Sequence, residues 1–448
     1  MHAHAWTAVT IAGVLASATI PQADTLLTIP QADTWRFSTS PAAASVSADG
    51  RYVALSSYAR LVPADTDARA DIYVLDRISG AVTLESVAVD DRPLIGDSSH
   101  PRLSGDGRYL VFDTVVVTVD GRLDTDIVIR DRVRNTATYV SHDRPPGRAA
   151  SRHPAISEDG REVVFASAAT TVVDGSDENG SGEDVYAFDT TTRAITRVSV
   201  DSHGVQRSTG ASFSPAVSGD GRFVAFTSTA SLDGNGRHAD AGARASLRAQ
   251  VYVRDLRLGI TTLASVATDG APAAGPSDHP AISEDGRFVA FVSEARLVRG
   301  DDNRSTDVFV RDLQGHATTL VSRSAWGGSG NGASVSPAIS ADGRFVAFQS
   351  TASDLVCARR CAAATEDVNL LPDVFLFDRV TNEMRWLSAT ASGGWPEESD
   401  APQIDAAGSV VTFSSRHPIE AGDLRNDFDV FVRIAASRNS DSASISSK

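Results

Sequence analysis

The stretch DHPAISEDGRFVAFVSEARLVRGDDNRSTDVFVRDLQGHATTLVS, from Asp278 to Ser322, decides the fold. Within it, residues 287–293 (RFVAFVS) alternate between two sets of side chains with the period of two that is typical of a β-strand. The preceding Asp285-Gly286 pair is typical of a hairpin turn, because glycine adopts the positive φ that such turns require. The stretch predicts four short strands, HPAIS, RFVAFVS, DVFVRDL and ATTLVS. A lone sheet of this size buries too little apolar surface to be stable, so we expect one copy of a repeat.

The same turn recurs along the whole chain. The motif Ser-x-Asp-Gly-Arg recurs at intervals of about 60 residues. Its glycines are Gly50, Gly107, Gly160, Gly221, Gly286 and Gly343, and a degenerate seventh copy ends at Gly408. Each copy is followed by a β-run and then by a third strand such as DVFVRD at Asp307. Seven units of this kind predict an all-β fold, a seven-bladed β-propeller of four-stranded blades.

The two ends of the chain indicate how the ring closes. The seventh unit stops after its third strand, at Arg433, and the segment Thr34–Ser38 (TWRFS) matches the fourth strands of other units. We therefore expect this N-terminal strand to complete the last blade, which removes exposed sheet edges. The predicted propeller spans residues 34–434, after a linker at 19–33. Residues 435–448 are poor in apolar side chains, and we expect a disordered tail.

Residues 1–18 resemble a secretory signal peptide. They contain a small, apolar run and an Ala16-Ser17-Ala18 cleavage pattern, although no Lys or Arg precedes the run. The alternative is an apolar, disordered N-terminus. The run is too short for a transmembrane anchor. We expect an exported protein, periplasmic or extracellular.

The net charge of −16 restricts the partners. An acidic surface repels nucleic acids and anionic lipids, so we expect no nucleic-acid partner. Basic or neutral proteins, sugars and cations remain open as partners, and we expect a monomer.

Cys357 and Cys361 are the two cysteines of the chain and lie in one long loop of the sixth unit. They could form a disulfide, contribute half of a metal site, or remain free thiols. In an exported protein we favour the disulfide.

The loops differ in length on the two faces of the predicted disc. The turns that join first to second strands and third to fourth strands are short, and they share one face, which we call the short-turn face. The loops from second to third strands and the connections between blades are long and polar, and they share the other, long-loop face. Loops on a rigid scaffold carry recognition, so we expect binding at the long-loop face. The Asp-Gly-Arg turns are explained by turn chemistry, with each Arg paired to a nearby carboxylate.

Acidic residues precede the third strand in several units. Unit one has Asp65, Asp67 and Asp71, and unit five has Asp301, Asn303 and Asp307, each with spacing i, i+2 and i+6. Hard oxygen ligands at this spacing suit Ca²⁺, as a structural cofactor. The alternative is that these side chains cap the strand and bind loop amides. Units two and seven carry Arg122 and Arg425 at the middle position, where we expect an Arg–carboxylate bridge instead.

Three first strands begin with His-Pro, at His100, His153 and His279. First strands line the central channel, so these histidines should surround its mouth on the long-loop face. They could bind a transition metal or a substrate, or form a hydrogen-bonded polar lining.

The unit from Pro280 to Asp312, PAISEDGRFVAFVS followed by LVRGDDNRSTDVFVRD, resembles the TolB-like propeller repeat family. The likeness covers nearly the whole chain from Thr34. It implies an exported protein that binds other proteins or envelope components. TolB itself has six blades and a separate N-terminal domain, which this chain lacks room for.

Two functions follow from this resemblance. We expect a non-catalytic binding scaffold that acts through the long-loop face, so a binding protein is favoured over an enzyme. The alternative is a metal-dependent lyase, since some seven-bladed relatives are oligogalacturonate lyases whose metal is held by channel-mouth histidines. A surface protein without a specific ligand is a third interpretation.

Overall fold

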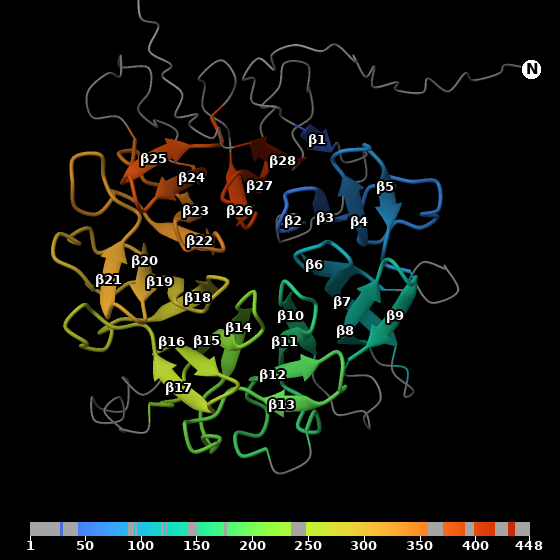
Figure 1. Cartoon of the computed structure of the whole chain (residues 1–448), viewed down its shortest axis with the longest axis horizontal. Helices are drawn as coiled ribbons and strands as arrows, with labels where there is room; N and C mark the ends of the chain where they lie inside the picture. The colour runs from blue at the N-terminus through green and yellow to red at the C-terminus, as the bar shows by residue number, and fades with distance from the viewer. Residues whose placement is uncertain are drawn as a thin grey trace, which may run out of the picture.

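The computed structural model describes residues 27–29, 44–87, 94, 96–117, 121, 123–140, 150–173, 177–233, 248–356, 371–389, 398–416 and 429–434. Strands within these residues form seven four-stranded antiparallel sheets arranged in a ring, as Figure 1 shows. The predicted all-β, seven-bladed propeller is confirmed.

The first four blades follow the chain in order. Blade 1 comprises β2 (Ala44–Val46), β3 (Tyr52–Ser57), β4 (Asp71–Asp76) and β5 (Val82–Leu84). Blade 2 comprises β6 (Ser98–Leu103), β7 (Tyr109–Val117), β8 (Leu123–Asp131) and β9 (Thr136–Tyr139). Blade 3 comprises β10 (Ser151–Ile156), β11 (Glu162–Ser167), β12 (Asp184–Asp189) and β13 (Ile195–Arg197). Blade 4 comprises β14 (Ser212–Val217), β15 (Phe223–Ser228), β16 (Gln250–Asp255) and β17 (Ile260–Leu263).

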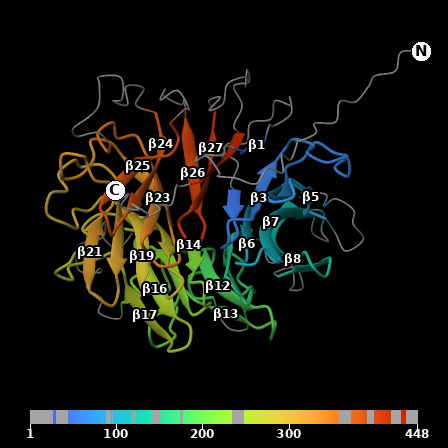
Figure 2. The same cartoon turned by 45° about the horizontal axis from the view of Figure 1, so that its top comes forward.

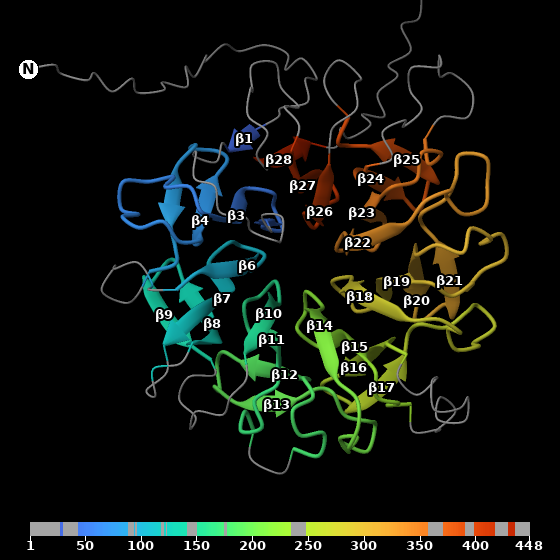
Figure 3. The same cartoon turned by 180° about the vertical axis from the view of Figure 1, so that it is seen from behind.

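The last three blades complete the ring. Blade 5 comprises β18 (Ser277–Ile282), β19 (Phe288–Ser293), β20 (Asp307–Asp312) and β21 (Ala317–Leu320). Blade 6 comprises β22 (Ser334–Ile339), β23 (Phe345–Ser350), β24 (Asp373–Asp378) and β25 (Glu383–Trp386). Blade 7 comprises β26 (Ser399–Ile404), β27 (Val410–Ser415), β28 (Asp429–Ile434) and β1 (Leu27–Ile29). From either side of the disc, first strands such as β6, β14 and β22 lie nearest the axis, and fourth strands such as β9, β17 and β25 lie at the rim (Figure 3).

The closure strand is β1 and not the predicted Thr34–Ser38. Antiparallel pairing joins Leu27 to Val432 and Ile29 to Val430, and β1 lies beside blade 7 in both Figure 1 and Figure 2. Closure by an N-terminal strand is therefore confirmed, but the strand lies inside the segment that the sequence assigned to a linker. Residues 34–38 lie outside the described residues, as do the predicted signal peptide and tail.

The core lies between the blades. The described residues include seven apolar clusters, each shared by two neighbouring blades, and one of them joins Val53 and Tyr73 of blade 1 to Val410 and Val432 of blade 7. Side chains alternate between the two faces of each second and third strand. Large side chains, such as Phe291 and the stacked aromatic rings of other blades, therefore point into the apolar clusters between blades. The ring is thus closed by packing as well as by strand pairing.

The repeated turn is locked by its own side chains. In blade 5, Ser283 Oγ donates to Asp285 Oδ1 at 2.8 Å, and the amide of Phe288 donates to Ser283 Oγ at 2.9 Å. Arg287 donates to both carboxylate oxygens of Asp312, at 3.0 and 2.7 Å. The equivalent Arg–Asp pairs are Arg51–Asp76, Arg108–Asp131, Arg161–Asp189, Arg222–Asp255 and Arg344–Asp378. The predicted structural role of this turn is confirmed.

Candidate functional site

The two faces of the disc differ in how their polar groups are satisfied. On the short-turn face the repeated Arg and Asp side chains pair with each other, as described above. At the opposite ends of the strands, on the long-loop face, the buried carboxylate oxygens of the described residues that accept no hydrogen bond include Oδ2 of Asp71, Oδ2 of Asp307 and Oδ1 of Asp400. Since burying an unpaired charge is costly, these positions are candidates for binding.

Blade 1 brings the three predicted aspartates together. The ligand atoms of Asp65, Asp67 and Asp71 all lie within 4.8 Å of one another, and this is the one such group of three His, Cys, Asp or Glu side chains among the described residues. Asp71 begins β4, whereas Asp65 and Asp67 lie in the loop before it. Asp65 Oδ2 accepts the hydroxyl of Tyr73 at 2.5 Å, and Asp65 Oδ1 accepts the amide of Asp67 at 3.1 Å.

Asp71 is the most deeply buried member of this group, at 1% exposure. Its Oδ1 accepts the hydroxyl of Ser86, and its Oδ2 has no partner. Burial raises the pKa of Asp71 to about 7 against the effect of the Ser86 hydrogen bond, and the negative charges of Asp65 and Asp67 add to the rise. Among the described residues, no positive charge offsets the rise in the pKa of this carboxylate.

Blade 5 repeats the arrangement with an amide in the middle. Asn303 Nδ2 donates to the carbonyl of Gly330 at 2.7 Å, and Asn303 Oδ1 accepts the amide of Ser305 at 2.8 Å. Asp307 Oδ1 accepts the hydroxyl of Ser322 at 2.6 Å. Its Oδ2 accepts no hydrogen bond of normal geometry. Burial raises the pKa of Asp307 to about 7, and hydrogen bonds from Ser322 and from the Asn303 amide oppose this rise. Asp301 is also buried.

Blade 3 contains a third copy, which the sequence interpretation missed. Asp177, Asn179 and Asp184 follow the same order, but one extra residue before the strand changes the last spacing. Here Gln206 Nε2 lies 2.8 Å from Asp177 Oδ1, 2.9 Å from Asn179 Oδ1 and 2.7 Å from Asp184 Oδ2. Three oxygens thus converge on one nitrogen.

A guanidinium group supplies the positive charge in blade 3. Arg197 Nε lies 3.4 Å from Asp184 Oδ2, and Arg197 Nη2 lies 4.0 Å from Asp177 Oδ1. Arg197 Nη1 also donates to Oε1 of Gln206, which fixes the orientation of the amide. Burial raises the pKa of Asp184 to about 6, although the Ser199 hydroxyl and the charge of Arg197 oppose the rise.

Two of the three predicted histidines come together. The rings of His100 and His153 meet edge to face, with centroids 4.6 Å apart. His100 Nδ1 lies 2.9 Å from Asp113 Oδ2, which also accepts the backbone amide of His153 at 3.2 Å. Burial and then the neighbouring His100 lower the pKa of His153 to about 4, so its ring is neutral at physiological pH.

His279 has a different partner. Its Nδ1 lies 2.9 Å from Asp278 Oδ1, and this hydrogen bond raises the pKa of His279 against the effect of burial. All three histidines have positive φ, between 49° and 53°, at a bulge of the first strand just before proline. Ser214, Ser336 and Ala401 share this conformation in other blades, so the bulge belongs to the repeat and not to a histidine site.

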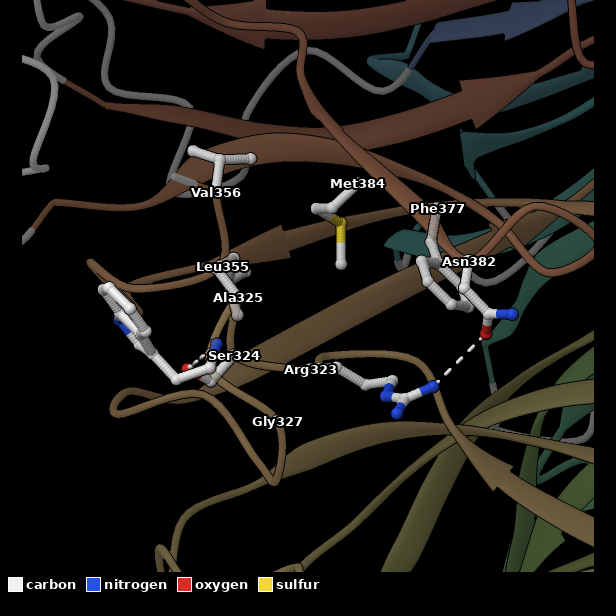
Figure 4. A pocket seen from close by; sticks show the side chains of 10 residues that line it. Arg323, Ser324, Ala325, Gly327, Leu355, Val356, Phe377, Asn382 and Met384 are labelled. Carbon is white, nitrogen blue, oxygen red and sulfur yellow. Dashed lines mark hydrogen bonds between the residues drawn. The ribbon is translucent and has the colours of Figure 1, made fainter. Parts of the chain in front are cut away.

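A cavity of about 600 Å³ opens between blades 5 and 6. Figure 4 shows Arg323, Leu355 and Met384 around it. Arg323 Nη1 donates to Asn382 Oδ1 at 3.2 Å across one side. Trp326, which also lines the cavity, is 73% exposed. Both polar and apolar side chains line this cavity, and no pattern in the repeats could have indicated it.

Several predictions lie outside the described residues. These are the Cys357–Cys361 disulfide, and the arginines of units two and seven with their loop carboxylates, namely Asp120, Arg122, Asp423 and Arg425. The described part of the chain includes no helix with the length and apolar character that crossing a bilayer requires.

Comparison with known proteins adds the fold relationship. No family model matches the chain, and no curated protein matches it in sequence. An oligogalacturonate lyase from Vibrio parahaemolyticus has a TM-score of 0.52 at 10% identity, with 92% of this chain and 97% of that chain covered. An oligogalacturonate lyase in complex with manganese has a TM-score of 0.51 at 12% identity, over 92% and 96% of the two chains.

TolB from Acinetobacter baumannii has a TM-score of 0.37 at 16% identity and covers 68% of this chain. This chain covers 56% of that TolB. The fold is that of a seven-bladed propeller with TolB proteins among its structural neighbours. At these identities the likeness concerns the fold alone.

Proposed function

We propose that this protein is an exported, non-catalytic propeller that binds a protein or envelope component through its long-loop face. Trp326 and the cavity beside it are the observation that carries the proposal. Large aromatic side chains are enriched at the centres of protein interfaces, and Trp326 is an exposed one that lines a cavity. The net charge of −16 favours a neutral or basic partner.

Trp326 is held in place by its own loop. Gly327 donates its amide to the carbonyl of Ser324 at 3.0 Å, and Ser324 donates its amide to the carbonyl of Gly328 at 3.1 Å. The amide of Ala325 donates to the carbonyl of Asp354 at 2.8 Å, which ties this connection to blade 6. A rigid anchor costs little conformational entropy on binding.

The test compares two exposed apolar side chains on opposite faces. Trp326 is 73% exposed in the connection between blades 5 and 6, and Ile78 is 78% exposed in the turn between β4 and β5. The protein is cross-linked to envelope extract, the partner is identified by mass spectrometry, and its affinity is then measured with purified components. Trp326→Ala should weaken binding at least tenfold, as for a hot-spot residue, and Ile78→Ala should leave it unchanged. Equal loss in both variants, or no partner at all, would reject the proposal.

A metal-dependent lyase remains the second candidate because of one contact. Asp113 binds Nδ1 of His100, which leaves Nε2 available, and such a carboxylate commonly orients a metal-binding histidine. The fit to a three-histidine site is incomplete, since His100, His153 and His279 do not form a group with ligand atoms all within 4.8 Å among the described residues. Manganese binding and an increase in ultraviolet absorbance with oligouronides, both abolished by His100→Ala, would favour the lyase over the scaffold.

A further inference from the structure

Three blades present the same set of oxygens on the long-loop face, but they differ in the positive group that these oxygens face. In blade 3 the oxygens of Asp177, Asn179 and Asp184 converge on Gln206 Nε2, and Arg197 adds a full positive charge. In blade 1 the ligand atoms of Asp65, Asp67 and Asp71 converge, and the nearest cation among the described residues is the exposed Arg69, whose Nε lies 3.8 Å from Asp67 Oδ2 and leaves Asp71 Oδ2 unpaired.

The strand register explains the difference. Arg197 is paired with Tyr186 across β12 and β13. The equivalent pairs are Tyr73 with Leu84 in blade 1 and Phe309 with Leu320 in blade 5. Leucine therefore occupies the position from which arginine reaches the oxygens in blade 3.

Blade 4 compensates in another way. Its third strand begins with Gln250 in place of aspartate, and Leu263 occupies the position of Arg197. Gln250 Oε1 accepts the hydroxyl of Ser265 at 2.7 Å, and Gln250 Nε2 donates to the carbonyl of Gly275 at 3.1 Å. In blade 4, therefore, both the positive group and the negative charge are absent. Blades 1 and 5 keep the aspartate, and Oδ2 of Asp71 and Oδ2 of Asp307 pair with no cation among the described residues.

We infer that Asp65, Asp67 and Asp71 of blade 1 bind a Ca²⁺ ion, which occupies the place that Gln206 Nε2 and Arg197 fill in blade 3. The unpaired Oδ2 of Asp71, on a side chain that is only 1% exposed, faces this place from the strand, and the two loop aspartates face it from the other side. Asp301, Asn303 and Asp307 form a second site with one carboxylate fewer and hence a lower affinity.

The donor set selects the metal. It consists of oxygens alone, whereas zinc and copper sites in proteins use histidine or cysteine. Ca²⁺ accepts six to eight oxygen ligands in flexible geometry, so carboxylates from a loop and a strand can be completed by carbonyls and water. Mg²⁺ requires a smaller and more regular shell, and we expect it to bind more weakly.

The ion also links two blades. The amide of Ala70, next to Asp71, donates to Asp97 Oδ1 at 2.9 Å, and Asp97 belongs to the connection between blades 1 and 2. Calcium held by Asp71 would therefore fix the loop before β4 against this connection. The inference does not depend on the proposed partner binding.

The experiment measures Ca²⁺ binding to the whole protein by calorimetry, and thermal unfolding in Ca²⁺, in Mg²⁺ and in EDTA. We expect 1 mM Ca²⁺ to raise the unfolding temperature by about 2 °C or more relative to EDTA, and Mg²⁺ to raise it less. Asp71→Asn should weaken the blade 1 site at least tenfold and reduce the Ca²⁺-dependent shift. Asp307→Asn should do the same for the weaker site.

A second readout separates loss of a ligand from damage to the fold. The amide introduced by Asp71→Asn retains an oxygen for the Ser86 hydroxyl and removes an unbalanced charge. This variant in EDTA should therefore be at least as stable as the unmodified protein in EDTA. Unchanged Ca²⁺ binding in Asp71→Asn, or no Ca²⁺-dependent shift in the unmodified protein, would overturn the inference.

Discussion

Gln206 Nε2 lies 2.7 Å from Asp184 Oδ2, at the centre of an oxygen cluster whose counterpart in blade 1 encloses no such nitrogen among the described residues. The amide arrives from the connection that follows the blade, 22 residues after the aspartate in the sequence. In this unit of the repeat, side chains of the protein itself supply the positive group. This difference between blades leads to the first prediction.

Replacing Arg197 should make blade 3 dependent on an added cation. Arg197→Leu copies the residue found in blades 1 and 5 and leaves Asp177 and Asp184 without their guanidinium partner. We expect a loss of about 3 kcal/mol in the free energy of unfolding in EDTA, as for other broken buried pairs. Urea unfolding measures this loss, and Ca²⁺ should recover part of it. Arg257→Leu, at an exposed position, serves as the control and should change the stability little.

Asp400 should make stability depend on pH. It is 7% exposed, and burial, followed by the charge of Glu398, raises its pKa to about 7. The folded protein therefore binds a proton more tightly than the unfolded chain, so stability falls as pH rises from about 4 to about 7 and is then constant. Asp400→Asn should remove the contribution of Asp400 to this fall in the free energy of unfolding, which is about 4 kcal/mol at most. The comparison is made in EDTA, by urea unfolding at pH 5 and pH 8.

The control for Asp400 is an exposed carboxylate. Asp302 is 70% exposed and pairs with Arg296 on the surface. Asp302→Asn should leave the difference between pH 5 and pH 8 as it is in the unmodified protein. If Asp400→Asn also leaves the stability difference between pH 5 and pH 8 unchanged, the burial of Asp400 does not raise its pKa.

Gly286 should be irreplaceable for two reasons. Its φ is +71°, and a Cβ atom added to it would lie 2.1 Å from Cδ2 of Phe223 in the neighbouring blade. We expect Gly286→Ala to cost about 2–4 kcal/mol through backbone strain and overpacking. Gly270 has a φ of +84° with open space around the Cβ position, so Gly270→Ala should cost only about 1 kcal/mol. Similar unfolding midpoints for Gly286→Ala and Gly270→Ala would show that the close contact with Phe223 does not destabilise the protein.

The correction to the closure strand is open to a direct test. A chain that begins at Pro30 lacks β1, whereas one that begins at Asp24 retains it. We expect the shorter chain to unfold at a lower temperature and to lose hydrogen-exchange protection at Val430 and Val432, where β28 becomes an edge strand. If Thr34–Ser38 closed the ring instead, both chains would be equally protected there.

The repeat made the fold predictable from the sequence. The Ser-x-Asp-Gly-Arg turn carries its own hydrogen bonds, as Ser283 and Asp285 show, so a local pattern was enough to count the blades. The closure strand was harder to assign because three residues, Leu27–Ile29, carry little pattern, and the Trp35 segment looked more like the other fourth strands.

The candidate site was predictable only in part. The spacing of Asp65, Asp67 and Asp71 brought them together as expected. One extra residue concealed the copy that ends at Asp184, and the group that completes it comes from Gln206 in a later connection. Spacing describes one loop at a time, whereas a charge buried between loops depends on side chains from distant parts of the chain.

The pairing of Leu27 with Val432 has a consequence for the order of folding. These two residues are about 400 positions apart, so the last blade is completed by two segments that are synthesised at widely separated times. Six blades can assemble from local hairpins during synthesis, but the ring stays open until the final strand has left the ribosome. A chain under synthesis therefore carries β1 without its partner strand until β28 has been made, and closure of the ring is a late event.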